Sequence, residues 1–403
     1  MKKIITILLI CSFIFCLSTP VLAENSIKSG AEPTDDYIIE SDVNPEIDVP
    51  SAILVEAKTG TVLFSKNADE KRAPASVTKV MTLLLVAEAI ESGTIGLTDE
   101  VCISSYAASM GGSQVFLREG ERLSVNDLIK CTVIASANDA AVALAEYTAG
   151  SESIFVDMMN NRASDLGLVG TNFENVTGLD DDTVNHTMSS EDIAVISREL
   201  IKHKCITDHS SVWQDSIRNG EFTLTNTNRL VRYYDGCTGL KTGSTDKAGF
   251  CVAASAKRGS LELIAVIMGA ESGTARNEAA RTLLDFGFSS FAVYESQSKP
   301  LGEITVTGGE KRALGVTEEA FFALINKKDV GKVRAEISLP KNVKAPISKG
   351  DVVGVVIYRI GDEEIGRSNI RACSSLEKMS FPKLFARVLL SSVTSHNKSR
   401  EKS

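Results

Sequence analysis

The chain has 403 residues, a length that predicts two or three domains, and 43% of them are hydrophobic, as in a soluble globular protein. Its formal net charge of −9 argues against a nucleic-acid partner, because contact with phosphates requires a basic surface. The 4 histidines show no metal-ligand spacing, which argues against a metal site and disfavours a Ser-His-Asp hydrolase.

Residues 1–23 have the pattern of a secretory signal peptide. Lys2 and Lys3 precede an apolar run at 4–17, and the small residue Ala23 marks the expected cleavage site. The run is shorter than the roughly 20 residues that a membrane span needs, so an uncleaved anchor helix is the weaker alternative. We therefore expect export to the outer face of a bacterial cytoplasmic membrane. The acidic, weakly apolar residues 24–47 predict a linker.

Removal of the signal peptide would leave an even number of cysteines, which permits disulfides in an exported protein. Their spacing is wide and contains no Cys-x-x-Cys motif, and the chain is long enough to form a core without cross-links. Buried free thiols are therefore the preferred interpretation. The cysteines are Cys102, Cys131, Cys205, Cys237, Cys251 and Cys373.

Residues 48–294 predict a mixed α/β domain. Two apolar strands, at 51–56 and 61–65, flank a Lys-Thr-Gly turn and predict a hairpin. The run at 80–90 is apolar nearly all round, which predicts a buried helix. Further helices are expected at 124–134, 139–148, 155–166, 190–203 and 276–286. Three β-rich segments predict an antiparallel meander, at 238–241, 250–256 and 261–269.

The sequence changes character after residue 294. Strand-like runs recur between glycines and prolines, so residues 295–376 predict a small all-β domain. These runs lie at 301–306, 312–316, 333–339 and 352–358. Within the last segment, 377–403, apolar residues recur at helical spacing from Phe381 to Val393, with Lys383 and Arg387 opposite them. This pattern predicts an amphipathic helix that makes peripheral membrane contact.

The first motif with chemical meaning is Ser76-Val77-Thr78-Lys79, at the start of the predicted buried helix. Residues three apart on a helix share a face, so Ser76 and Lys79 can touch. A serine hydroxyl needs a base to become a good nucleophile, and a lysine serves as one when burial lowers its pKa. Alone, the motif is weak, and a helix cap followed by a solvated lysine is the plainer interpretation.

Two more motifs follow in chain order. Ser136-Ala137-Asn138 falls at a break between two helices, where a hydroxyl and an amide can point into a cleft, although both residues are also common helix caps. Lys241-Thr242-Gly243 ends a strand-like segment, where glycine permits close approach of a substrate backbone and lysine and threonine can hold an anion. Each motif is weak alone, but the set in this order is specific.

The three motifs together resemble the low-molecular-mass penicillin-binding proteins, specifically the D-alanyl-D-alanine carboxypeptidases of serine peptidase family S11. The resemblance covers about residues 48 to 291, and the region after it resembles the family's C-terminal domain and membrane anchor. The stretches that carry it are 52–60, 74–82, Asn175 with 178–180, and 239–249. It implies a penicillin-binding/β-lactamase-like α/β fold, with a five-stranded antiparallel sheet, flanking helices and a helical subdomain, followed by an all-β domain.

The resemblance also implies the reaction, which is removal of the terminal D-alanine from peptidoglycan stem peptides without any cofactor or metal. Ser76 would be acylated by substrate, and equally by β-lactam inhibitors, with Lys79 as its base. Ser136 would pass a proton to the leaving D-alanine, and Asn138 would position Lys79 and the substrate. Lys241 would keep the cleft positive.

Substrate binding would fall to a second group of residues. The resemblance implies that Thr242 and Arg276 bind the terminal carboxylate, with a plain surface charge as the alternative for Arg276. Gly243 would let the substrate approach. The backbone N–H groups of Ser76 and Ser244 would form the oxyanion hole; some family members carry histidine at the position of Ser244, which leaves this backbone role intact.

Three alternatives remain. A D,D-endopeptidase would use the same motifs on an internal bond. A class A-like β-lactamase needs a Glu-x-x-Leu-Asn element between the second and third motifs, and neither Glu174-Asn175 nor Glu199-Leu200 fits it. A catalytically silent wall-binding protein is disfavoured because every motif residue is intact.

Overall fold

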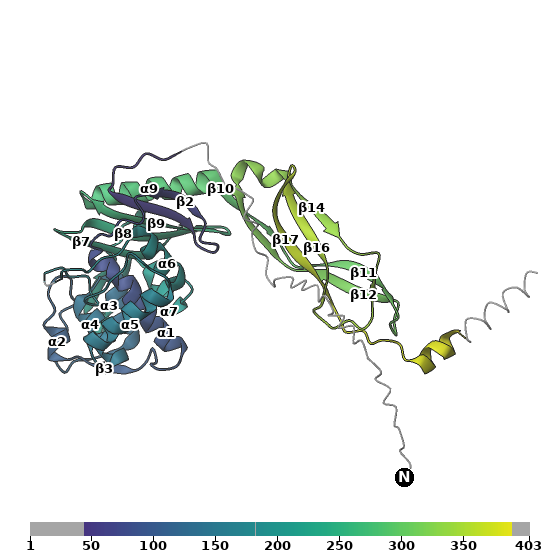
Figure 1. The fold of residues 1–403 in the computed structure, drawn as a ribbon. Helices are drawn as coiled ribbons and strands as arrows, with labels where there is room; N and C mark the ends of the chain where they lie inside the picture. The colour runs from purple at the N-terminus through teal and green to yellow at the C-terminus, as the bar shows by residue number, and fades with distance from the viewer. Residues whose placement is uncertain (1–43, 182, 389–403) are drawn as a thin grey trace, which may run out of the picture.

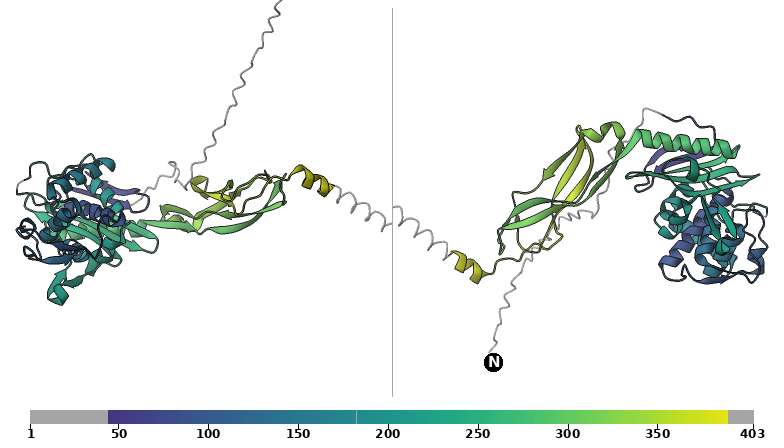
Figure 2. Two further views of the ribbon diagram at one scale, coloured as in Figure 1. Left: turned by 90° about the horizontal axis from the view of Figure 1, so that it is seen from below. Right: turned by 180° about the vertical axis from the view of Figure 1, so that it is seen from behind.

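The structure is a computed structural model that describes residues 44–181 and 183–388. An α/β domain and a β-rich domain lie end to end, and a short helix at 381–388 lies at the end of the molecule far from the α/β domain (Figures 1 and 2). The predicted signal peptide, most of the predicted linker and the tail after residue 388 fall outside the described residues. Within the described ranges, no helix has both the length and the apolar character needed to cross a bilayer.

The α/β domain is built on a five-stranded sheet in the order β2-β1-β9-β8-β7, with every neighbouring pair antiparallel. This confirms the predicted fold class, hairpin and meander. The first strand in the chain, β1, pairs with β9, so the sheet closes only when both ends of the domain are present. The strands are β1 (Ser51–Glu56), β2 (Val62–Lys66), β7 (Cys237–Thr245), β8 (Gly249–Arg258) and β9 (Leu261–Ala270).

Helices cover both faces of this sheet. Along β1, Ile53 and Val55 face the larger core, whereas Leu54 faces the core under α9 (Gly273–Ser290), as the two-residue repeat of a strand requires. Gly287 lets α9 approach closely, because a Cβ there would lie 2.4 Å from the Leu263 side chain. The sheet is therefore buried on both faces, and its edge strand β7 is left to border the helical part of the domain.

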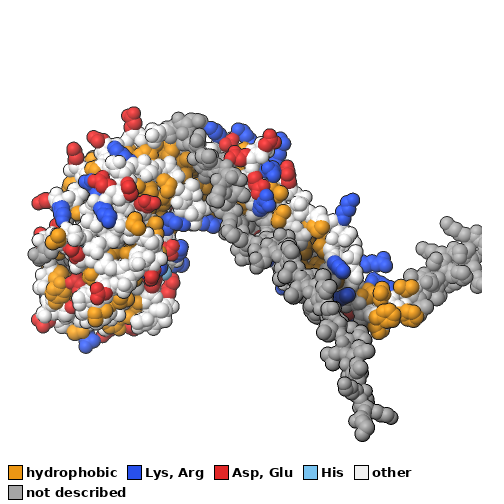
Figure 3. Space-filling view, viewed as in Figure 1, with side chains coloured by type: hydrophobic (Ala, Val, Ile, Leu, Met, Phe, Trp, Pro, Cys, Tyr) orange, Lys and Arg blue, Asp and Glu red, His pale blue; other side chains and the backbone are white. Residues whose placement is uncertain are grey.

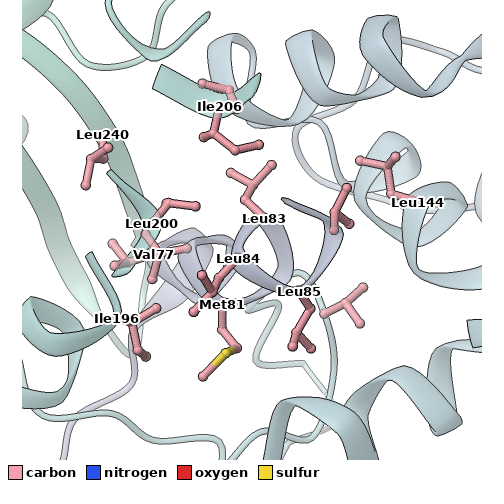
Figure 4. Packing of buried hydrophobic residues seen from close by; sticks show 14 of the residues in the cluster. Val77, Met81, Leu83, Leu84, Leu85, Leu144, Ile196, Leu200, Ile206 and Leu240 are labelled. Carbon is pink, nitrogen blue, oxygen red and sulfur yellow. The ribbon is translucent and has the colours of Figure 1, made fainter. Parts of the chain in front are cut away.

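The helical subdomain surrounds α1 (Lys79–Glu91), which the short 3₁₀ turn η1 (Ala75–Thr78) introduces. Every residue of α1 from Lys79 to Ala87 is buried, which confirms the predicted buried helix. The other helices are α2 (Ser105–Ala108), α3 (Val125–Ile134), α4 (Asn138–Ala149), α5 (Glu152–Asp165), α6 (Ser190–Leu200), α7 (Lys204–Ser210) and α8 (Leu230–Tyr233). Figure 4 shows how α1 packs: Leu83, Leu84 and Leu85 lie among Leu144, Ile196, Leu200 and Ile206.

Local capping explains several helix starts. The Oγ atoms of Ser124, Ser151 and Ser189 accept hydrogen bonds from backbone N–H groups at the starts of α3, α5 and α6. The serine at 151 begins α5 three residues before the predicted start. Two small hairpins complete the subdomain, β3 (Glu100–Cys102) with β4 (Arg122–Ser124) and β5 (Gln214–Ile217) with β6 (Phe222–Thr225), the latter joined by the 3₁₀ turn η2 (Arg218–Gly220).

The C-terminal domain is the expected all-β unit, with a six-stranded sheet in the order β14-β16-β17-β12-β11-β15. Its strands are β11 (Lys299–Thr307), β12 (Ala313–Glu318), β14 (Val333–Ser338), β15 (Asn342–Lys344), β16 (Val352–Ile360) and β17 (Glu363–Ala372). A separate pair joins β10 (Phe291–Ser296) to β13 (Phe321–Asn326), which precedes the 3₁₀ turn η3 (Lys327–Lys332). The sequence predicted the strands β11, β12, β14 and β16 and missed the others.

The junction between the domains is a continuous strand. The expected boundary between residues 294 and 295 falls inside β10, which follows α9 directly and pairs along its length with β13. Phe291, at its start, is buried in the α9 core and meets Phe286 edge-on at 5.5 Å. Two cations add to the junction: Lys327 Nζ donates to the Phe288 carbonyl at 2.9 Å, and Lys58 Nζ lies 3.7 Å from the Phe322 ring.

The 6 cysteines outside the predicted signal peptide are free thiols, which confirms the preferred interpretation over a disulfide framework. Their expected burial holds fully only for Cys131 and Cys251. Cys102, the last residue of β3, and Cys373, directly after β17, are exposed.

Candidate active site

The first and best-defined contact joins the two residues of the first motif. Lys79 Nζ donates a hydrogen bond to Ser76 Oγ at 3.0 Å. Ser76 lies in the 3₁₀ turn rather than in α1 itself, and a turn with three residues per repeat places residues 76 and 79 on the same side. The lysine is fully buried, whereas the serine is partly exposed. A nucleophile that a substrate can reach is thus paired with an amine that water cannot reach.

The amine of Lys79 has two further acceptors, Asn138 Oδ1 at 2.6 Å and the Thr177 carbonyl at 2.9 Å. Burial lowers the pKa of Lys79 well below its ordinary value, and the nearby charge of Lys241 lowers it further; Asp139 opposes both effects. When the amine loses the proton that it donates to Ser76 Oγ, it keeps two N–H groups and gains one lone pair. Asn138 and Thr177 can take the two N–H groups, which leaves the lone pair for the Ser76 hydroxyl.

Asn138 is held from both ends of its amide. Its Nδ2 donates to the Gly111 carbonyl at 2.7 Å while its Oδ1 faces Lys79, and its backbone N–H donates to the Ser113 carbonyl at 2.7 Å. The next residue, Asp139, is buried and accepts the backbone N–H groups of Val115 and Leu117 at 3.1 and 3.0 Å. The start of α4 therefore fixes both the amide and the loop at 111–117.

Ser136 lies where the sequence predicted, in the break between α3 and α4. It is buried and has a φ of 63°, a left-handed conformation that costs energy for any residue other than glycine. Within the described part of the chain, no side chain or backbone group forms a hydrogen bond with its hydroxyl. That hydroxyl is available to a bound ligand.

The third motif lies on β7, against the turn that carries Ser76. A Cβ on Gly243 would lie 2.7 Å from the Ser76 backbone nitrogen, so only glycine permits this approach. Lys241 is buried and donates to the Thr242 carbonyl at 2.9 Å. Burial lowers its pKa to about 7, and Arg276 contributes to the shift. Ser244, one residue beyond the glycine, is exposed at the edge of the site.

Arg276 is in the first turn of α9 and is only 7% exposed. The alternative that it is a surface charge is therefore wrong. Its Nε donates to Asn277 Oδ1 at 3.1 Å, and burial lowers its pKa. Among the described residues it forms no ion pair. Three buried basic side chains thus lie near one another, those of Lys79, Lys241 and Arg276, an arrangement suited to an anionic ligand. The carboxylate of Asp139 opposes the lowering of the Lys79 pKa.

Three residues that shape the site were not predicted from the sequence, and two of them are threonines. Thr177 supplies the carbonyl that binds Lys79, and its turn is held by Asn175, whose Oδ1 accepts the backbone N–H groups of Thr177 and Gly178. The tight Asn-x-x-Gly turn was a usable signal. Thr227 accepts a hydrogen bond from Thr242 Oγ1 at 2.8 Å and donates its own N–H to the Ile134 carbonyl, and nothing in the sequence marked it.

A third missed residue is His186, which supports the turn before α1. Its Nδ1 accepts the Glu174 backbone N–H at 3.1 Å, so its Nε2 carries the proton in the neutral ring and donates to Thr78 Oγ1 at 2.8 Å. Burial lowers its pKa to about 4, which keeps this tautomer neutral. No cluster of side chains in residues 44–181 and 183–388 has the composition of a metal site.

The sheet, the helical subdomain and the serine–lysine pair define a serine enzyme of the penicillin-binding class. Comparison with known families agrees. The family model described as D-alanyl-D-alanine carboxypeptidase matches residues 39–272, and the one described as penicillin-binding protein 5, C-terminal domain, matches residues 288–378. The chain belongs to the D-alanyl-D-alanine carboxypeptidase family S11, which confirms the predicted family, fold and enzyme class.

Individual relatives extend along most of the chain. It is 40% identical over 338 residues to D-alanyl-D-alanine carboxypeptidase DacF of Bacillus subtilis, covering 82% of this chain and 86% of the relative. It is 36% identical to DacD of Escherichia coli, with 88% and 90% coverage. Among solved structures, penicillin-binding protein 5 of Haemophilus influenzae matches with a TM-score of 0.71 at 31% identity, over 84% of this chain and 100% of that one.

Proposed function

We propose that this D-alanyl-D-alanine carboxypeptidase removes the terminal D-alanine from peptidoglycan stem peptides through an acyl-enzyme on Ser76. The observation that carries this proposal is the hydrogen bond between Lys79 Nζ and Ser76 Oγ, formed by an amine whose pKa is lowered by burial. Lys79 takes the hydroxyl proton as Ser76 Oγ attacks the penultimate carbonyl. The C–N bond then breaks, and the departing D-alanine amine receives a proton through Ser136.

Deacylation repeats these steps with water in place of the leaving amine. Lys79 takes a proton from water, the hydroxide attacks the ester carbonyl, and the proton returns to Ser76 Oγ, so the enzyme is regenerated without a cofactor. We assign the oxyanion hole to the backbone N–H groups of Ser76 and Ser244. The tight packing of Gly243 on the Ser76 nitrogen supports this, because it brings β7 to the turn that carries the first donor.

We assign carboxylate recognition to Thr242, Lys241 and Arg276. A carboxylate is bound best by charge-assisted hydrogen bonds, and buried cations without a carboxylate partner supply them. This assignment favours a carboxypeptidase over a D,D-endopeptidase, which does not need a free terminus. The contacts of the two glutamates considered for the β-lactamase alternative also support this: Glu174 accepts the backbone N–H groups of Val184 and Asn185, and Glu199 pairs with Lys202.

The test uses the full chain and two peptides that end in D-Ala-D-Ala, one with a free terminal carboxylate and one with a terminal amide. We expect release of D-alanine from the free acid only, and loss of both turnover and labelled-penicillin acylation in Ser76→Ala. Equal cleavage of the amide would favour the endopeptidase. Penicillin labelling of the Ser76→Ala variant at another residue would remove Ser76 from the mechanism.

We further propose the location in which this reaction takes place. Residues 1–23 would direct export and be removed, residues 24–47 would form a linker, and the catalytic domain of residues 48–294 and β-rich domain of residues 295–376 would lie outside the cytoplasmic membrane. Mass spectrometry of the mature N-terminus in an expressing bacterium tests this: a chain that begins after Ala23 is expected, and one that retains residue 1 would contradict it.

The last segment, 377–403, would make the peripheral membrane contact. In the helix at 381–388, four large apolar side chains are exposed, Phe381, Leu384, Phe385 and Val388. Figure 3 shows hydrophobic side chains gathered at this end of the described chain. Such a helix binds a bilayer surface weakly, so deletion after Ser380 should release the protein into the soluble fraction while turnover is retained. Continued membrane binding of the truncated, signal-cleaved protein would refute the proposal.

A further inference from the structure

Beside the third motif, four side chains form a stack that the proposed mechanism does not use. Arg229, Arg232, Tyr233 and Trp213 alternate cation and ring, and we call them the arginine ladder. The Arg229 guanidinium carbon lies 5.6 Å from the Tyr233 ring centroid. The Arg232 guanidinium carbon lies 5.7 Å from the Tyr233 ring centroid and 5.3 Å from that of Trp213. The rings of Tyr233 and Trp213 meet edge-on, with their centroids 6.3 Å apart. These spacings are within the range of cation–π attraction.

The two arginines of the ladder are exposed and lack an acidic partner. Within the described residues, neither forms an ion pair or a side-chain hydrogen bond. Other arginines of the same domain form ion pairs: Arg218 pairs with Glu121, and Arg162 pairs with Glu88. In a chain of net charge −9, this is a local positive surface. The rings hold the guanidinium groups in place, so an arriving anion meets donors that are already oriented.

The ladder is tied to the catalytic motifs through Thr227. That residue receives the hydrogen bond of Thr242 Oγ1 and donates its backbone N–H to the Ile134 carbonyl, two residues before Ser136. Asn228 Nδ2 then donates to the Gly239 carbonyl at 3.0 Å, which fixes the chain beside β7. Arg229 follows Thr227 by two residues, a backbone reach of at most about 7 Å. The backbone of Arg229 therefore lies close to Thr227, the hydrogen-bond partner of the threonine assigned to the terminal carboxylate.

We propose that the arginine ladder is an anion-binding surface at the rim of the site that attracts and holds carboxylates of the peptidoglycan stem peptides, other than the terminal carboxylate bound by Thr242. This inference rests on the proposed function. The guanidinium fork matches a carboxylate with two parallel hydrogen bonds. A positive surface beside a cleft raises the local concentration of an anionic substrate and its rate of association, and salt weakens that effect.

The experiment compares full-length wild-type enzyme with the double variant Arg229→Gln/Arg232→Gln. The matched control is Arg281→Gln/Arg334→Gln, which removes two exposed arginines, one on α9 and one on β14, that also form no ion pair within the described residues. Two peptides ending in D-Ala-D-Ala serve as substrates. One carries further free carboxylates along its length, and in the other these are amidated while the terminal carboxylate is kept.

For the peptide with further carboxylates, the ladder variant should lose about tenfold in kcat/KM at 10 mM salt, through KM rather than kcat. The loss should shrink at 150 mM salt, since the screening length falls from about 30 Å to about 8 Å. The amidated peptide should be affected much less, and the control variant should match wild type on both. Tyr233→Leu, which removes the ring that both arginines contact, should show an intermediate loss.

Three results would overturn the inference: equal losses on the two peptides, an equal loss in the control variant, or a loss that does not depend on salt. Binding of a phosphodiester wall polymer that falls in the ladder variant, with peptide turnover unchanged, would also overturn it. Turnover of a small uncharged ester checks that the catalytic centre is intact in each variant. If the wild-type enzyme released no D-alanine from either peptide, that result would instead refute the proposed function.

Discussion

The α/β domain and the C-terminal domain both bury ionisable side chains, but they satisfy them differently. In the α/β domain, Lys79, Lys241 and Arg276 are buried close to one another, and burial lowers the pKa of each. In the C-terminal domain, Glu318 is 1% exposed and receives hydrogen bonds from Tyr358 and Ser368. Lys241 and Arg276 each make one side-chain hydrogen bond within the described residues and keep donors for a ligand, whereas the buried acid is satisfied by its own domain.

Backbone conformation separates the domains in the same way. Within the described residues, every non-glycine residue with a left-handed φ lies in the α/β domain. Two of them are Ala75, with a φ of 47°, directly before the proposed nucleophile Ser76, and Ser136, with a φ of 63°, the first residue of the second motif. Strained conformations persist where surrounding structure enforces them, often at functional sites. Clustered buried basic side chains and local backbone strain therefore occur together in the α/β domain.

The largest expected effect comes from Lys79→Arg. Arginine retains the positive charge and much of the side-chain length, but it stays protonated and cannot act as a base. Loss of the base should reduce acylation by between about 10² and 10⁴-fold. Stopped-flow acylation with a fluorescent penicillin measures it. Acylation near the wild-type rate would mean that a buried cation, rather than a neutral amine, is what the site requires.

Gly243→Ala tests the approach of β7 to the nucleophile. The new methyl group would lie 2.7 Å from the Ser76 nitrogen, so the strand must retreat and the proposed oxyanion donors must separate. Loss of one such donor typically reduces kcat by about 10² to 10³-fold. Gly331→Ala, at an open position in the C-terminal domain without a left-handed φ, serves as a control for steady-state turnover. An active Gly243→Ala enzyme would argue against this oxyanion hole.

Arg276→Ala should reduce kcat/KM for a D-Ala-D-Ala peptide by an amount equivalent to about 1.5–3 kcal/mol, the usual contribution of a hydrogen bond to a charged group. Acylation by a small uncharged ester should change much less, because the arginine is expected to bind the terminal carboxylate and not Ser76. Equal losses with both substrates would indicate that Arg276 supports the structure of the site instead.

In the C-terminal domain, Tyr358→Phe should act on stability alone. The variant keeps the ring stacked on Phe321 at 3.9 Å but removes a donor to Glu318. Loss of one such hydrogen bond typically costs about 0.5–1.5 kcal/mol, because Glu318 keeps the bond from Ser368. Urea unfolding should show this loss with unchanged turnover, and Tyr294→Phe, whose hydroxyl has no hydrogen bond among the described residues, is the control. A fall in turnover would show that the two domains are functionally coupled.

The smallest expected effect is the pH dependence contributed by Lys241. Its pKa is about 7 in the folded chain against an ordinary 10.5, so above pH 7 the unfolded chain binds more protons and stability rises with pH. Lys241→Met should make this rise shallower between pH 7 and 9 and stabilise the protein at pH 7 by about 0.5–2 kcal/mol. Thermal unfolding across that range measures it; an unchanged slope would mean that Lys241 is protonated equally in both states.

The sequence predicted which motif residues come together. Ser76, Lys79 and Asn138 meet as their motifs indicated, because the first two motifs fall at the starts of helices. The third motif was expected at the end of a strand, but it lies inside β7, which continues to Thr245 because β8 pairs with it. Thr177 could not be predicted in the same way, because it binds Lys79 through a backbone carbonyl, which every residue type possesses. Thr227 approaches Thr242 only when a loop folds back on β7.

Burial and strand pairing were also beyond local reasoning. Arg276 is charged and lies in a helix of mixed polarity, and only the packing of α9 on the sheet places it inside the protein. The boundary expected at residue 294 followed a change in residue composition, whereas the structure continues one strand through it because β13, which is distant in the sequence, provides its partner.

The continuous strand β10 has a mechanical consequence. A flexible linker would let the α/β domain rotate relative to the C-terminal domain, and proteases would cleave it readily. Here the backbone passes from α9 into a paired strand, with Phe291 held in one core and the rest of β10 bonded to β13. A pull on the C-terminal domain is therefore expected to pass through β10 to α9, which packs on the five-stranded sheet, so the junction should resist rotation of one domain against the other.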